Sequence, residues 1–284
     1  MRLKKVKKTK NEYVFAGGVW VRNFCKPDAQ SVLENNMLSK KDIDTVLHNE
    51  RSNRTLQLGM ISDESFYFPK VVIVSDGYDF QRKIECLRLF PDKDICVLAV
   101  NKALKLWPLV GVENPRSINF YVVNNPYDEA SYFLPQRYFP ACIGSTRTSY
   151  GFMSAYQGMR YFYEPTPERG FGYIKSQMYF IDDYRNPISS ALSLAYRLGA
   201  RKIMMLCCDD SFKEEKPSAV RLSNDLWTYP QHLRSQEILD AQSYWLKQAG
   251  IQVANYSSGR EYENAVYIKD DDEFKTFFTE EDVI

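Results

Sequence analysis

Three apolar runs constrain the fold of this chain more than any other feature of its sequence. The segments KVVIVSDG (70–77), DICVLAVN (94–101) and SINFYVVNNP (117–126) are rich in β-branched and aromatic residues, as buried strands are. Between the first two lies DFQRKIECLRLF, in which Phe80 and Ile84 begin a series of apolar residues at helical spacing. Strands that alternate with helices predict βαβ units and therefore a parallel sheet.

The same alternation returns in the second half of the chain. A helix is predicted over residues 186–199, with Asn186 as its N-cap, Pro187 at the first helical position and Gly199 as its terminator. The elements predicted after it are a buried strand (200–210), a helix (231–249), a strand in IQVANYS, and a closing strand and helix. We therefore expect an α/β, Rossmann-like domain over residues 69–284, with a mainly parallel sheet and helices on both faces.

Two parts of the chain fall outside this regular pattern. Residues 1–68 predict a small irregular N-terminal segment, which holds a basic tail, a strand pair interrupted at Gly17-Gly18 and a helix around IDTVLHNE. Residues 127–185 are rich in Tyr, Phe, Pro and Arg and are poorly periodic. We expect them to form an insertion with one helix and long loops that covers the carboxyl edge of the sheet.

The charge and the cysteines of the chain limit the partners and the cellular compartment that we expect for it. Lys and Arg number 37 against 36 Asp and Glu, so no global field draws the chain to nucleic acid or to an anionic membrane. Only the tail over residues 1–12 offers a nucleic-acid contact, and simple solvation is its alternative role. No run reaches the ~18 apolar residues that a membrane helix needs. The six cysteines lack metal-type spacing and fit reduced thiols, so we expect a cytoplasmic protein without membrane contact.

Polar residues stand where the predicted strands stop, which is where open parallel sheets bind ligands. The candidate binding residues are Ser75, Asp76, Gly77, Asn101, Asn124 and Asn125. Gly77 permits close backbone approach to a phosphate, or it only closes a turn while Asp76 or Asp79 caps the next helix. Asn124 and Asn125 either orient a ligand through their amides or form an Asx turn before a proline.

Two acids and one histidine are the candidates for chemistry. Asp209 and Asp210 follow a buried strand, where carboxylates can hold Mg²⁺, although one of them capping the next turn is the alternative. His232 lies at or near a helix start and is a candidate general acid or base, with a structural role as its alternative.

Five arginines are interleaved with Tyr and Phe across the irregular middle of the chain: Arg137, Arg147, Arg160, Arg169 and Arg185. This mixture suits a phosphate pocket, an aromatic layer packed on the sheet, or a protein interface.

These patterns resemble the 6-hydroxymethylpterin diphosphokinase MptE-like family, which is Rossmann-like and related in outline to sialyltransferase-type glycosyltransferases. The resemblance covers roughly residues 70–275 and rests on element order, on AVNKAL and SLAYRLGARKI, and on the strand-end Asp209. It implies a Gly-rich turn near phosphate, of which Gly77 is kept here. Asn125 stands where the family has an acid, and Cys207 where it has a glycine.

Two classes of function follow. The first is a nucleotide-dependent transferase, pyrophosphokinase-like or glycosyltransferase-like, whose donor is ATP or a nucleotide sugar bound at the sheet's carboxyl edge. Mg²⁺ on Asp209 or Asp210 and a base at His232 would serve it. The second is a non-catalytic Rossmann-like module of a larger assembly, such as a viral one, that binds protein partners through its aromatic and Arg-rich segment. A dinucleotide oxidoreductase is disfavoured because Asn101 stands where an acid is needed.

Overall fold

The structure is a computed structural model of the 284-residue chain. It describes residues 13–16, 19–22, 40–89, 95–100, 102–107, 118–127, 130, 132, 134–135, 138–165, 180–181, 186–209, 211–221, 226–259 and 261–279. The candidates Asn101 and Asp210, three of the five arginines (Arg137, Arg169 and Arg185) and the basic tail therefore lie outside the described residues.

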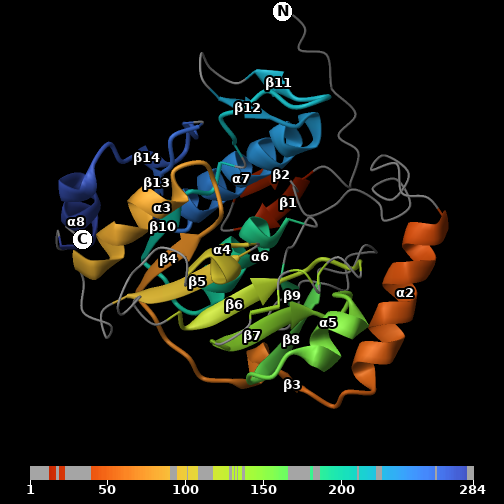
Figure 1. Cartoon of the computed structure of the whole chain (residues 1–284). Helices are drawn as coiled ribbons and strands as arrows, with labels where there is room; N and C mark the ends of the chain where they lie inside the picture. The colour runs from red at the N-terminus through yellow and green to blue at the C-terminus, as the bar shows by residue number, and fades with distance from the viewer. Residues whose placement is uncertain are drawn as a thin grey trace, which may run out of the picture.

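A single parallel sheet organises the described part of the chain (Figure 1). Its strand order is β14-β13-β10-β4-β5-β6-β7-β8-β3, and β9 pairs with β8. The longer strands are β4 (Lys70–Val74), β5 (Cys96–Val100), β6 (Phe120–Val123), β7 (Ala141–Ser145), β8 (Arg160–Pro165), β10 (Lys202–Leu206) and β13 (Gln252–Tyr256). The shorter ones are β3 (Gly59–Met60), β9 (Phe180–Ile181) and β14 (Val266–Tyr267). Every pairing within this sheet is parallel, which confirms the predicted α/β class.

Helices cover both faces of the sheet, and this explains why its central strands are apolar throughout. One face packs against α3 (Phe80–Lys83), the 3₁₀ turn η2 (Ile84–Leu89), α4 (Ala103–Leu106), α5 (Tyr150–Ala155) and α8 (Asp271–Thr279). The other face packs against α6 (Pro187–Arg197) and α7 (Pro230–Gln248). Successive residues of β4 alternate between the two cores, with Val72 and Val74 in the first and Val71 and Ile73 in the second.

The helix α6 begins and ends as its sequence predicts. The Asn186 side chain accepts a hydrogen bond from the Ile188 N–H at 2.8 Å, and Pro187 follows at the first helical position. At the other end Gly199 has a φ of +82°, the left-handed conformation that a glycine terminator supplies. Local signals thus define both ends of this helix.

The N-terminal segment contains the elements that the sequence indicates. Strands β1 (Tyr13–Ala16) and β2 (Val19–Arg22) form an antiparallel pair on either side of Gly17-Gly18. Helix α2 (Lys40–Arg54) follows, and Figure 1 shows it beside α5 and the β7–β8 end of the sheet. The strand β3 then joins the sheet at β8, and the 3₁₀ turn η1 (Ile61–Asp63) follows it.

The expectation of one helix and long loops for residues 127–185 was wrong over its described part. This segment contains β7 and β8, which extend the parallel sheet beyond β6, with α5 between them. The sequence ACIGS of β7 is too small and polar to suggest a buried strand, yet α5 covers it on one face. In β8 (RYFYEP) three successive aromatic residues favour a strand, but Arg160 before them and Glu164 and Pro165 after them weaken that signal.

The order of the strands defines a topological switch point between β4 and β10. From β4 the chain proceeds to β5, β6, β7 and β8 on one side, and then crosses back to β10 on the other side of β4. The helix after β4 lies on one face, and α7, which follows β10, lies on the opposite face. Loops diverge at the carboxyl ends of such strands, so ligands of open α/β sheets bind there.

A hairpin of β11 (Val220–Arg221) and β12 (Trp227–Thr228) completes the described elements. No helix among the described residues is long and apolar enough to cross a membrane.

Candidate functional site

The turn after β4 is bound directly to the end of β10. The Ser75 N–H donates to the Leu206 carbonyl and the Gly77 N–H donates to the Cys207 carbonyl, both at 3.0 Å. A Cβ on Gly77 would lie 2.4 Å from Oδ1 of Asp209 and 2.5 Å from the Cys207 oxygen. Glycine is therefore required here because two turns approach each other closely, and the Gly77 N–H is already used within the chain.

The turn after β10 begins at Cys207, which has an unusual backbone conformation. Its φ is +55°, in the left-handed region that glycine adopts at little cost. The backbone at this position therefore has a conformation for which a side chain with a Cβ is poorly suited. The vicinal Cys207 and Cys208 face opposite cores of the sheet, and neither forms a disulfide.

Asp209 is a buried carboxylate that joins three segments. Its Oδ2 accepts from the Gly259 N–H at 2.6 Å, its Oδ1 accepts from the Ser211 N–H at 3.3 Å, and only 1% of the residue is exposed. Its backbone carbonyl accepts from the Gln236 side chain of α7 at 2.7 Å. Burial raises the pKa of Asp209, while these N–H bonds and the charge of Lys83 oppose that shift. The carboxylate thus holds the loop after β13 against the end of β10.

Asp76 differs from Asp209 because part of its surface reaches solvent. Burial raises its pKa above the ordinary carboxyl value, whereas the charge of Lys102, from the loop after β5, and a hydrogen bond from the Ser75 hydroxyl act in the other direction. A carboxylate with a raised pKa, solvent access and a neighbouring cation is equipped to accept a proton. Among the described strand-end acids, Asp76 is best placed for chemistry.

Lys83 is a buried cation of this site that the sequence did not suggest. The residue is 3% exposed, and its Nζ lies 4.3 Å from the centre of the Tyr256 ring. Burial lowers the pKa of Lys83, and the Cys207, Asp79 and Asp209 side chains oppose that shift. The signal for its burial was its spacing of three residues from Phe80, which places it on the inner face of the helix.

Asp79 stands at the N-cap position of α3 but does not cap that helix with its side chain. Its Oδ2 lies 3.0 Å from Nη2 of Arg82 and accepts the hydroxyl hydrogen bond of Ser258. The alternative role of helix cap is therefore not the one that Asp79 adopts. With Asp209 and Gly259, this contact gives the β13 loop two attachments to the switch point.

Asn124 and Asn125 form hydrogen bonds within the chain. The Asn124 amide donates to the Ser190 hydroxyl at 3.1 Å, which links the end of β6 to α6. The Asn125 Oδ1 accepts from the Tyr127 N–H at 2.9 Å, the geometry of the Asx turn named as the alternative. Ser149 adds an N–H bond to the Asn125 carbonyl, so the loops after β6 and β7 are joined.

His232 lies in the first turn of α7, against the ring of Tyr229 at 5.7 Å between centroids. It precedes by one helical turn Gln236, the residue that binds the Asp209 carbonyl. Residues four apart share a face of a helix, so His232 is on the side of α7 that meets the end of β10.

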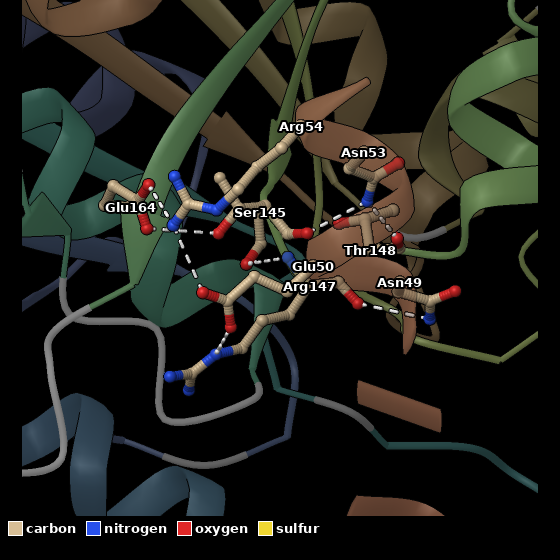
Figure 2. A network of polar contacts seen from close by, with 9 residues as sticks. Asn49, Glu50, Asn53, Arg54, Ser145, Arg147, Thr148 and Glu164 are labelled. Atoms are coloured by element: carbon tan, nitrogen blue, oxygen red, sulfur yellow. Dashed lines mark hydrogen bonds and ion pairs between the residues drawn. The ribbon is translucent and has the colours of Figure 1, made fainter. Parts of the chain in front are cut away.

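Of the five predicted arginines, two are described, and they differ. Arg160 donates to the Met153 carbonyl at 2.7 Å and serves the packing of α5. Arg147, in the loop after β7, lies beside Glu50 of α2 (Figure 2), with its Nε 3.5 Å from that carboxylate. A quarter of its side chain is exposed. Of these two arginines, Arg147 is therefore the one in a loop at the carboxyl edge, where it pairs with α2.

No group of three or more His, Cys, Asp or Glu side chains in the described part of the chain is arranged to hold a metal ion. Both oxygens of Asp209 accept N–H bonds, and Asp210 lies outside the described residues. The predicted Mg²⁺ therefore has no described ligand set at this edge.

The comparisons with known proteins place the fold. No family model matches the chain, so the MptE-like relationship is not confirmed, and no curated protein matches it. The structure is similar to the MAf glycosyltransferase from Magnetospirillum magneticum AMB-1, with a TM-score of 0.60 and 12% sequence identity. The similarity covers 82% of this chain but only 40% of that protein. At this identity it establishes the shared Rossmann-like fold.

Proposed function

We propose that this protein is a glycosyltransferase-like transferase that binds a phosphorylated donor, a nucleotide sugar, at the carboxyl edge of its sheet. The observation that carries the proposal is the switch point between β4 and β10, where the desolvated carboxylate of Asp76 lies near Lys102. The fold likeness to a glycosyltransferase favours a nucleotide sugar over ATP as the donor.

In the proposed transfer, Asp76 acts as the general base. An acceptor hydroxyl attacks the anomeric carbon of the sugar, and a new carbon–oxygen bond forms while the bond from that carbon to the donor phosphate breaks. The bonding electrons leave with the nucleotide phosphate, and the hydroxyl proton passes to Asp76. His232 is the second candidate for this proton.

In this proposal, cations at the same edge neutralise the negative charge of the leaving phosphate. Lys102 is exposed beside Asp76, and Arg147 reaches the edge from the loop after β7. In this proposal Asp209 is a positioning residue, since its oxygens hold the Ser211 and Gly259 N–H groups. No step is assigned to Mg²⁺, because the described residues do not provide its ligands.

The test is release of nucleotide from a panel of CMP-, UDP- and GDP-sugars by the wild type and by Asp76→Asn, with and without EDTA. Loss of a general base lowers turnover by about 10²–10⁴-fold, so the variant is expected to bind the donor but to turn it over at least 100-fold more slowly. Asp44→Asn, at an exposed position on α2, is the matched control and retains activity. Equal turnover in Asp76→Asn and the wild type would refute the assignment.

The second candidate is a non-catalytic binding module. The observation that favours it is that Gly77, Asn124, Asn125 and Asp209 all direct polar groups into the chain itself. If no donor in the panel binds to the folded protein, with or without Mg²⁺, this module becomes the preferred assignment.

A further inference from the structure

Helix α2 is attached to the carboxyl edge by two buried asparagines on one face. The Asn53 amide donates to the carbonyls of Thr146 and Thr148, at 2.9 and 2.7 Å, and Asn53 is fully buried. Four residues earlier, Asn49 donates to the carbonyls of Pro126 and Arg147, at 2.6 and 3.4 Å. The Asn49 Oδ1 accepts from the Tyr150 N–H at 3.3 Å. Two side chains of one helix thus bind backbone groups of the loops after β6 and β7.

Charged side chains on the same helix strengthen this attachment (Figure 2). Nη2 of Arg54 lies 3.2 Å from Glu50 and 3.0 Å from Glu164 of β8. Glu50 also lies 3.5 Å from Nε of Arg147, and Glu164 accepts from the Thr146 hydroxyl at 3.3 Å. The network therefore fixes both the backbone of the β7 loop and the direction of its arginine.

We propose that Asn49 and Asn53 of α2 are positioning residues for the transferase site, and that they act by holding the loop of residues 145–149 and thereby Arg147 at the carboxyl edge. This inference rests on the proposed function, in which Arg147 meets donor phosphate. The N-terminal helix would then support one side of the site, because the two hydrogen bonds from the buried Asn53 amide limit the movement of this loop.

The first measurement is hydrogen exchange, which reports on the loop without any substrate. In Asn53→Ala, amides of residues 146–150 are expected to exchange faster than in the wild type, while those of β4 and β10 are unchanged. His48→Ala, at an exposed position of the same helix, is the control and leaves the loop protected. Unchanged exchange at 146–150 in Asn53→Ala would overturn the proposal.

The second measurement is a double-mutant cycle on kcat/KM for the donor. A misplacement near 1 Å costs up to about 100-fold, so Asn53→Ala is expected to lower kcat/KM by about 10–100-fold. In an Arg147→Ala background the same substitution is expected to cost less than threefold, because Asn53 acts through that arginine. Additive effects, or full activity of Asn53→Ala, would overturn the positioning role while leaving the proposed function intact. A wild type without turnover on any donor would instead reject the proposed function, and this inference with it.

Discussion

The contact between Gly77 and the end of β10 gives the sharpest prediction of stability. In Gly77→Ala the new Cβ would lie 2.4 Å from Oδ1 of Asp209 and 2.5 Å from the carbonyl oxygen of Cys207. An ordinary contact needs about 3.5 Å, so the two turns must separate by about 1 Å. Neither oxygen can withdraw without loss, because one accepts the Ser211 N–H and the other accepts the Gly77 N–H.

The magnitude follows from these two effects. Overpacking costs about 1–3 kcal/mol, and a hydrogen bond lost between the turns adds about 0.5–1.5 kcal/mol. We expect Gly77→Ala to lower the free energy of unfolding by about 2–4 kcal/mol, which is a fall in Tm of about 3–7 °C for a chain of this size. Urea unfolding followed by circular dichroism measures the first quantity, and differential scanning calorimetry the second.

Gly59→Ala is the matched control for this substitution. A Cβ on Gly59 would meet only a ring carbon of Tyr161 at 3.8 Å, an ordinary contact, and is expected to change stability by no more than about 0.5 kcal/mol. If Gly77→Ala is as stable as Gly59→Ala, the close approach of the two turns is not a feature of the folded protein, and the reasoning fails.

Three further predictions concern single side chains. The raised pKa of Asp76 means that the folded state binds its proton more tightly than the unfolded state, so this group's contribution to stability is lost as pH rises above about 4. The stability of Asp76→Asn relative to wild type is therefore expected to increase with pH over that range in urea titrations, and a constant difference would contradict the shift. Asn186→Ala removes the cap of α6 and is expected to lower the free energy of unfolding by about 1 kcal/mol in the same urea assay. Asn186→Ser, which still offers a capping oxygen, is expected to retain most of that stability. The buried Lys202 Nζ donates to the Phe277 carbonyl of α8 at 3.0 Å. Lys202→Met is therefore expected to lower the free energy of unfolding by about 1.5–3 kcal/mol and to expose α8 to proteolysis. Lys275→Met, at an exposed position of α8, is the control and is expected to have neither effect.

The predictable part of the fold is the part encoded by local pattern. The strands β4, β5, β6 and β10 are short, largely apolar runs with few competing interpretations, and α6 carries a cap, a proline and a terminal glycine. The strands β7 and β8 could not be found in this way. Their burial comes from packing against α5 and neighbouring strands, and their own residues, which are small, charged or aromatic, do not form an apolar run.

The candidate site, like the fold, was predictable only in part. Strand-end position was enough to select Asp76, Gly77 and Asp209, since chain order places them at one edge. Their roles depend on partners that only the folded chain brings together, such as Gly259 for Asp209. The asparagines of α2 were missed because polar residues on a helix are usually solvated, and nothing local indicates that they bind another loop.

Binding of a nucleotide sugar at the switch point tests the central claim most directly. The measurement is a thermal-shift titration of the wild type and of Lys102→Ala with the same donor panel, with and without Mg²⁺. A donor at 100 times its Kd stabilises the folded state by ~2.7 kcal/mol, so one member of the panel is expected to raise the wild-type Tm by about 4–5 °C. In Lys102→Ala the same shift is expected to need at least tenfold more donor. A folded wild type whose Tm no donor changes would contradict the account.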